Sequence, residues 1–423
     1  MQRRVFLRSG ALALVTMGLS PQFLKRATYG MELKGAAKGK VLVCLFQRGA
    51  ADALNVVVPH GEKTYYELRP NIAIPRPGAG DASAIDLDGF FGLHPALRGM
   101  KPLWDQGILA PIHAVGSPNS TRSHFDAQDY METATPDRKG TPEGWVNRYL
   151  AAHGTCAECQ PGRDQSGKEP AFRAVAMTQQ TPRIFEGPAP TIAMAGLEQF
   201  SVRATGTQVE RLEALYRTGT ADLVHGTGKE MFDAVKMLQS ANPQNYTPQN
   251  GAVYPAGQFG RRMLQIAQLI KANVGVEIAF ADAGGWDTHV NEGAGTGQLA
   301  TRLTEFGNSI AAFALDMGER MSDIVIMTMS EFGRTAKENG NRGTDHGHAG
   351  SMFVVGGPVK GKKVYGKWPG LDRGQLYEGR DLALTTDFRT VFAEVAGAHL
   401  GANKLSAIFP RFEADKGWLG VLG

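Results

Sequence analysis

The sequence predicts an α/β fold in which helices cover both faces of a largely parallel central sheet. The first observation is a series of apolar, β-branched runs without polar alternation, which is typical of strands buried on both faces. The second is that segments with helical spacing of apolar residues separate these runs, as they do in βαβ units. The third is the composition: 42% of the 423 residues are hydrophobic and 20% are charged, which allows a large core and excludes a disordered chain.

Six runs are predicted to be strands, because each is rich in Val, Ile, Leu, Phe or Met and ends at glycine or polar residues. In chain order they are 40–46, 107–115, 171–177, 274–281, 323–329 and 351–356. Cys44 lies inside the first run and is expected to be a small core residue.

Seven segments are predicted to be helices from the spacing of their apolar residues. They are 95–105, 141–153, 208–217, 229–239, 258–272, 299–321 and 385–399. Segment 332–350 has neither pattern, and a loop of that length suggests a function. We expect one domain over residues 40–423, with loop excursions near 156–169 and 218–228.

The first 30 residues differ in charge from the rest of the chain. They contain five basic residues and no acid, so the remainder carries 4 − 5 = −1 of the net charge of +4. A nearly neutral body disfavours a nucleic-acid-binding protein.

The paired Arg3 and Arg4 precede a mild apolar stretch over 10–19, as in a twin-arginine export signal. This stretch is shorter than the ~20 residues that a permanent transmembrane helix needs. We therefore expect residues 1–30 to be a signal recognised by the twin-arginine translocation machinery, and the protein to be periplasmic or in the cell envelope. That route carries folded proteins, which is compatible with a metal loaded before export.

Polar clusters follow four predicted strands, and a fifth cluster precedes the last strand. Ligands of open parallel sheets bind beyond the carboxyl ends of the strands, so these clusters are expected to converge. Carboxylates and neutral imidazoles bind divalent cations of the Zn, Mn or Ca type, and a mixture of nitrogen and oxygen favours Zn, Mn or Fe over Mg. The candidate ligands of one or two such ions are Asp52, Asp287, His289, Glu331, Asp345, His346 and His348.

The same clusters hold candidates for catalysis and for binding an anionic substrate. Ser123 is the candidate nucleophile, and His124 is a candidate acid for the leaving group. Guanidinium groups match oxyanions, so the candidate substrate-binding residues are Arg48, Asn55, Arg122 and Arg334.

Structural roles without catalysis are the alternatives for residues of four of these clusters. Ser123 could be the N-cap of a helix that begins near His124, and Asp287 with His289 could cap a turn. Residues 345–348 could form a hydrogen-bonded loop, and Glu331 could pair with Arg334.

Several segments together resemble DUF1501, an exported bacterial family of unknown function. The matching segments are 48–55 (RGAADALN), 65–74 (YYELRPNIAI), 122–132 (RSHFDAQDYME), 284–289 (GGWDTH), 330–335 (SEFGRT) and 345–350 (DHGHAG). That family is similar to the alkaline phosphatase-like superfamily, which includes sulfatases. The resemblance implies a three-layer sandwich with a metal pair held by acids and histidines at strand ends, and a Ser or Thr nucleophile.

Carried over to this chain, the resemblance makes Asp52 the acid after the first strand and Ser123 the nucleophile. Asp287 and His289 resemble the pair of one metal site, and His346 or His348 resembles the last histidine ligand. This sequence departs from the superfamily pattern at two points. Asp287 and His289 are separated by one residue where the superfamily commonly has three. Glu331-Phe332 also replaces an Asp-His tandem. One metal instead of two, Asp345 as a substitute ligand, or a loss of catalysis would each account for them.

Two functions follow from these observations. The first is an exported metal-dependent hydrolase of phosphate or sulfate esters. The alternative is a catalytically degenerate envelope protein that binds a ligand or partner on the same scaffold. A third reading uses Cys156 and Cys159, which could form a disulfide, half a zinc site or a redox pair.

Overall fold

The computed structural model describes residues 39–78, 80–153, 172–197 and 246–423. Several predicted features lie outside these described residues. They are the export signal, the excursions near 156–169 and 218–228, the helices at 208–217 and 229–239, and the pair Cys156 and Cys159.

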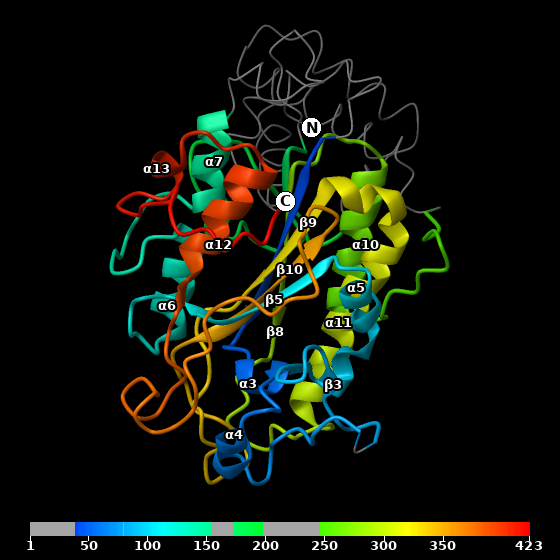
Figure 1. Cartoon of the computed structure of the whole chain (residues 1–423). Coiled ribbons are helices and arrows are strands. Elements are labelled where there is room, and N and C mark those ends of the chain that lie inside the picture. The colour runs from blue at the N-terminus through cyan, green and yellow to red at the C-terminus, as the bar shows by residue number, and fades with distance from the viewer. Residues whose placement is uncertain (1–38, 79, 154–171, 198–245) are drawn as a thin grey trace, which may run out of the picture.

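The centre of the described chain is an eight-stranded, mostly parallel sheet, as predicted (Figure 1). Every neighbouring pair is parallel except the two that involve β10, which is antiparallel to β5 and to β9. Across the sheet the strands are β11 (Thr386–Asp387), β5 (Leu109–Gly116), β10 (Gly350–Gly356), β9 (Ile324–Met329), β1 (Val41–Arg48), β8 (Ile278–Gly284), β6 (Ala174–Ala176) and β7 (Ile192–Ala193).

Helices cover both faces of this sheet, so the architecture is a three-layer α/β sandwich (Figure 1). Alternate residues of β1 belong to different cores: Val43 and Leu45 face one layer, whereas Cys44 and Phe46 face the other. The first layer contains α5 (Lys101–Asp105), α10 (Gln258–Lys271) and α11 (Gln298–Met317). The second contains α6 (His124–Thr133), α7 (Trp145–His153), α12 (Phe388–Glu394) and α13 (Leu405–Ile408).

Four predicted helices are interrupted or more than one residue shorter than the periodicity indicates, and one of them is α7, which begins at Trp145 instead of residue 141. Segment 95–105 is a 3₁₀ helix, η2 (Pro95–Met100), followed by α5, and Pro102 lies in the first turn of α5. The helix predicted over 299–321 ends at Met317, because Gly318 takes a positive φ of 54° before η6 (Gly318–Asp323). Segment 385–399 consists of α12 and a π-helical turn, η7 (Val395–His399).

Short elements cluster after the carboxyl end of β1. They are α3 (Ala53–Val56), β2 (Val57–Val58), α4 (Lys63–Leu68), β3 (Ile85–Asp86) and β4 (Gly92–Leu93). The three strands form a small antiparallel sheet in the order β2-β4-β3. One more 3₁₀ helix, η3 (Arg183–Phe185), lies between β6 and β7. None of the described helices has the length and apolarity required to cross a membrane.

The topology brings the polar clusters to one edge of the sheet. Because β1, β5, β8 and β9 are parallel, the residues that follow them emerge at the same edge. β10 runs in the opposite direction, so the residues that precede it, including His346 and His348, reach that edge as well.

Arg69, which follows α4, contacts both the loop after β1 and the loop after β9. Its side chain is fully buried and pairs with both carboxylate oxygens of Asp52, which follows β1. The guanidinium also donates to Asn55 Oδ1 at 2.8 Å and to the carbonyl oxygens of Thr335 and Ala336, each at 2.9 Å. A single buried cation therefore joins the loop after β1 to the loop after β9.

We predict that Arg69→Met lowers the free energy of unfolding by about 3–5 kcal/mol, because the Asp52 carboxylate would stay buried without its partner. Denaturant unfolding measures this loss. Lys63→Met is the control: Lys63 pairs with Glu67 on the surface and is 87% exposed, so its replacement should leave the midpoint unchanged. Equal midpoints for the two variants would contradict this role of Arg69.

Candidate functional site

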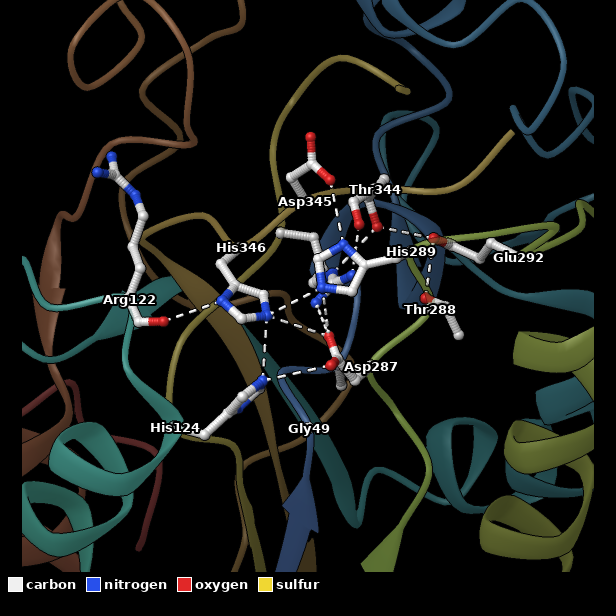
Figure 2. A network of polar contacts seen from close by, with 12 residues as sticks. Gly49, Arg122, His124, Asp287, Thr288, His289, Glu292, Thr344, Asp345 and His346 are labelled. Atoms are coloured by element: carbon white, nitrogen blue, oxygen red, sulfur yellow. Dashed lines mark hydrogen bonds and ion pairs between the residues drawn. The ribbon is translucent and has the colours of Figure 1, made fainter. Parts of the chain in front are cut away.

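Three histidines and one aspartate from three separate segments converge at the carboxyl edge of the sheet (Figure 2). His124 is the first residue of α6, Asp287 and His289 follow β8, and His346 lies in the long loop before β10. The convergence predicted for these four residues is therefore present.

The Nε2 atom of His346 is the centre of this cluster. It lies 3.1 Å from Nε2 of His124, 3.0 Å from Nε2 of His289 and 3.2 Å from Oδ1 of Asp287. Oδ1 of Asp287 is also 3.0 Å from Nε2 of His289, and its Oδ2 is 3.5 Å from Nε2 of His124. All three imidazoles thus present the same ring nitrogen to a common region.

The other ring nitrogen of each histidine points outward to an oxygen that accepts its hydrogen. Nδ1 of His124 donates to Oε1 of Glu331 at 2.8 Å, and Nδ1 of His289 donates to Oδ1 of Asp345 at 3.1 Å. Nδ1 of His346 donates to the backbone carbonyl of Arg122 at 2.9 Å, while the Arg122 side chain extends away from the cluster (Figure 2). In the neutral tautomers assigned by these bonds, all three Nε2 atoms carry lone pairs that face one another.

With all three imidazoles neutral, this arrangement could hold a cation. A neutral imidazole carries one N–H, and in each of these three it is the Nδ1–H, which donates to an oxygen outside the cluster. The three Nε2 atoms and the Asp287 carboxylate are then all acceptors and cannot form hydrogen bonds with one another. His124, Asp287 and His346 form a group whose ligand atoms all lie within 4.8 Å of one another, and His289 contacts two members of it. Three nitrogens and one oxygen are a donor set that Zn, Mn or Fe accepts.

Glu331 is built to orient His124. Its side chain is fully buried, and its Oε1 also accepts from the Gly49 backbone N–H at 2.9 Å and from Gln128 Nε2 at 2.8 Å. Burial alone would raise the pKa of Glu331, but the bonds from His124 and Gln128 outweigh it and hold the pKa below its usual value. A side chain at Gly49 would place its Cβ 2.8 Å from the Asp287 backbone nitrogen, and the residue has a φ of 120°.

Phe332 backs the cluster with an apolar surface. Its ring centroid lies 5.0 Å from that of His124 and 5.1 Å from that of His346, and the residue is buried. The Glu331-Phe332 pair therefore supplies an orienting carboxylate and a packing ring rather than two ligands.

Arg334 sets the charge next to Asp287. The guanidinium is buried, donates to Oδ1 of Asp287 and is held by the hydroxyl and carbonyl oxygens of Thr344. Partial burial raises the pKa of Asp287, but the ion pair with Arg334 outweighs it, so the pKa lies below its usual value. Glu331 and Arg334 form no pair with each other, because Glu331 bonds to His124 and Arg334 to Asp287.

The three arginines expected to bind an anion are all engaged with carboxylates. Arg48 pairs with Asp282 and Glu132, each at 2.9 Å. Arg122 pairs with Asp381 at 2.6 Å and Glu378 at 2.7 Å. Arg334 pairs with Asp287. Among the described residues, none of these three arginines therefore offers the cluster an unpaired positive charge.

The remaining predicted residues lie around or behind the cluster. Asp52 and Asn55 belong to the buried network of Arg69, and Asp345 receives hydrogen bonds from His289 and Asn339. The ring of His348 stacks on Tyr377 at 4.3 Å between centroids. Ser123 is exposed and has the N-cap position of α6, but its side chain makes no capping bond.

Sequence reasoning missed the residues that support the cluster from behind. Arg69 lies inside a segment that carried the family resemblance, but an arginine in a loop gives no signal that it will be buried. Glu292 is also fully buried and contacts Thr288 and Thr344, in the two loops that carry Asp287, His289 and His346. Gln128 could have been found from its position one helical turn after His124, since residues four apart share a helix face.

A family model described as "Protein of unknown function (DUF1501)" matches residues 112–408, which is more than half of the chain. The chain belongs to the DUF1501 family. The part matched to DUF1501 contains His124, Asp287, His289 and His346, whereas Asp52 and Arg69 precede it. No curated protein matches this DUF1501 chain.

We predict that the histidines of the metal-free protein titrate at different pH. The hydrogen bond to Glu331 raises the pKa of His124 above 6.5. Burial lowers the pKa of His346 below 6.5, and this effect outweighs the hydrogen bond to the Arg122 carbonyl, which raises it. The stability that protonated His124 contributes is therefore present below pH 6.5 and is lost as the pH rises through its raised pKa.

Imidazole NMR signals followed against pH measure these values. Glu331→Gln should lower the pKa of His124 towards its ordinary value, and Glu413→Gln, a surface change, should leave it unchanged. A pKa of His124 that is the same in wild type and Glu331→Gln would contradict the assigned bond.

Proposed function

We propose that this DUF1501 chain is a metal-dependent hydrolase of phosphate or sulfate esters. The observation that carries the proposal is the inward convergence of three Nε2 atoms and the Asp287 carboxylate, with every Nδ1 hydrogen directed to an outer acceptor. The proposal includes the kinship with the alkaline phosphatase-like superfamily that the sequence motifs suggest.

The ligands in this proposal are Nε2 of His124, His289 and His346 together with Asp287. A divalent ion held by them would supply Lewis-acid stabilisation to an ester oxyanion and lower the pKa of a neighbouring hydroxyl. Three of these residues form one group and His289 contacts two of its members, which favours a single ion over two. His124 is assigned to the ligand set rather than to the leaving group, because its Nδ1 is committed to Glu331 and its Nε2 faces the other ligands.

Ser123 is the proposed nucleophile. It precedes His124 directly, is exposed, and has a hydroxyl that the helix N-terminus does not use. In the proposed reaction Oγ forms a bond to phosphorus or sulfur as the ester bond breaks, and the alcohol leaves with a proton. Water then cleaves the seryl ester, which releases the inorganic anion and restores the hydroxyl.

A second candidate, a binding protein without turnover, is favoured by the pairing of the arginines. Arg48, Arg122 and Arg334 are each matched by carboxylates, so little positive charge is left for a substrate anion. On this reading the chain keeps the cation and a ligand but no longer hydrolyses esters.

The proposal also includes export through the twin-arginine machinery to the periplasm or envelope. Arg3 and Arg4 with the apolar stretch after them support it. A protein exported after folding would carry its ion from the cytoplasm.

We predict about one equivalent of Zn, Mn or Fe in the full chain purified without chelators, measured by elemental analysis. His346→Ala should remove that ion, because it deletes the nitrogen at the centre of the cluster. His60→Ala is the control, since the side chain of this buried histidine bonds to Asp86 at 2.9 Å and to none of the four candidate ligands among the described residues, so it should not affect the metal content. An unchanged metal content in His346→Ala would contradict the assigned ligands.

We further predict that the metal-loaded protein hydrolyses aryl phosphate or aryl sulfate esters and that Ser123→Ala lowers kcat at least 100-fold while it retains the ion. Ser120→Ala, a change of an exposed serine in the same loop, should retain turnover. A fully loaded wild-type protein without turnover on any ester would support the binding protein and exclude the hydrolase.

A further inference from the structure

Glu292 lies directly behind the candidate metal ligands and is fully buried. Its Oε2 accepts hydrogen bonds from the hydroxyl of Thr288 at 3.0 Å and from the hydroxyl of Thr344 at 2.8 Å. Figure 2 shows the carboxyl group between these two threonines, on the far side of the cluster from His124. One buried carboxyl group thus contacts both loops that carry the candidate ligands.

Each threonine is adjacent to candidate ligands along the chain. Thr288 lies between Asp287 and His289, and Thr344 precedes His346 by two residues. The loops are also joined by backbone bonds, since Thr344 donates to the Thr288 carbonyl at 3.1 Å and Glu292 donates to the Arg342 carbonyl at 2.9 Å. A displacement of the Glu292 carboxyl group would therefore move Asp287, His289 and His346 relative to one another.

The second oxygen of Glu292 indicates the protonation state. Oε1 is buried and receives a hydrogen bond from no donor among the described residues. Its neighbour is the carboxylate of Asp52, whose oxygens both pair with Arg69. Because Glu292 forms no ion pair among the described residues, a neutral Glu292, whose acid hydrogen can be donated to Asp52, fits this environment better than a buried charge does.

The charges around Glu292 agree with this assignment. Asp52 is balanced by Arg69, and Asp287 is balanced by Arg334, which also bonds to Thr344. An ionised Glu292 would leave one buried negative charge without a partner. Burial, followed by the charge of Asp52, raises the pKa of Glu292 well above its ordinary value.

We propose that Glu292 is a positioning residue that holds the two ligand-bearing loops in register, and that it does so as a neutral carboxylic acid hydrogen-bonded to Asp52. Its effect on a bound ion rests on the proposed metal site, whereas the neutral state and the loop contacts do not. A neutral acid can donate a hydrogen bond to Asp52 and accept hydrogen bonds from two hydroxyls at the same time. A glutamine amide can do the same, but an ionised glutamate cannot.

The test compares Glu292→Gln and Glu292→Ala in the full chain. We measure the melting temperature of the metal-free protein and the dissociation constant for Zn²⁺ by competition with a chelator. Glu292→Gln should keep both values close to wild type, with a change in affinity below threefold. Glu292→Ala should lower the melting temperature and weaken Zn²⁺ binding by about 10- to 100-fold, as removal of outer support for metal ligands does.

Two further variants control for folding. Thr288→Val removes one hydroxyl without changing the side-chain shape, and it should weaken Zn²⁺ binding even if Glu292→Ala does not fold. Glu394→Gln is the matched control, because Glu394 is a buried glutamate that accepts only backbone N–H groups, from Leu419, Gly420 and Leu422. This variant should lower the melting temperature and leave Zn²⁺ affinity unchanged.

The outcomes separate this inference from the proposed function. A loss of melting temperature in Glu292→Gln as large as in Glu292→Ala would overturn the neutral state. Unchanged Zn²⁺ affinity in both Glu292→Ala and Thr288→Val would overturn the positioning role. If the wild type binds no Zn²⁺, the positioning role falls together with the proposed metal site. The melting temperatures then still decide the protonation state.

Discussion

The site depends on the commitment of three Nδ1 hydrogens to oxygens outside the cluster. Two carboxylates and one backbone carbonyl accept these hydrogens, from His124, His289 and His346. The tautomers are fixed in this way, and three nitrogen lone pairs face the Asp287 carboxylate. Because such an assembly of acceptors repels itself, the surrounding structure must hold it in place until a proton or a cation joins it. The loops, the buried ion pairs and the packing ring of Phe332 all serve this requirement.

Buried charge behind the cluster provides that support. Arg69 links the segment after β1 to the loop after β9, and Arg334 links that loop to Asp287. Burial of guanidinium and carboxylate groups costs free energy that their mutual attraction offsets only when each is paired. The network achieves this balance with Asp52 on Arg69 and Asp287 on Arg334, and a protonated Glu292 adds hydrogen bonds without adding charge. Stability and the geometry of the site therefore depend on the same residues.

Much of the fold could be predicted from the sequence, because buried parallel strands are continuous apolar runs. Each of the six predicted runs overlaps one strand of the central sheet. The short strands β7 and β11 could not be predicted, since two residues carry no periodicity. The rule that ligands bind beyond the carboxyl ends of parallel strands predicted the edge at which the polar clusters meet. The structure confirms that His124, Asp287, His289 and His346 lie together there.

The roles of individual residues within the site were harder to predict. The sequence does not show whether an arginine or glutamate will be exposed or buried in an ion pair. The ion pairs of Arg48, Arg122 and Arg334 with carboxylates could therefore not be predicted. The same holds for Arg69 and Glu292, whose importance arises from contacts between loops that lie far apart along the chain. Residue types and strand ends indicated where a site would form. They did not indicate which charged side chains would form ion pairs with each other.

The most direct test of the account is X-ray absorption spectroscopy at the zinc edge on the full chain loaded with one equivalent of Zn²⁺. The account predicts a first shell of nitrogen and oxygen at about 2.0–2.1 Å. Multiple scattering should indicate three imidazoles, and His289→Ala should reduce the number to two. A shell of oxygen alone, fewer than two imidazoles in the wild type, or a second metal at about 3.5–4 Å would contradict a single ion held by three histidines and Asp287.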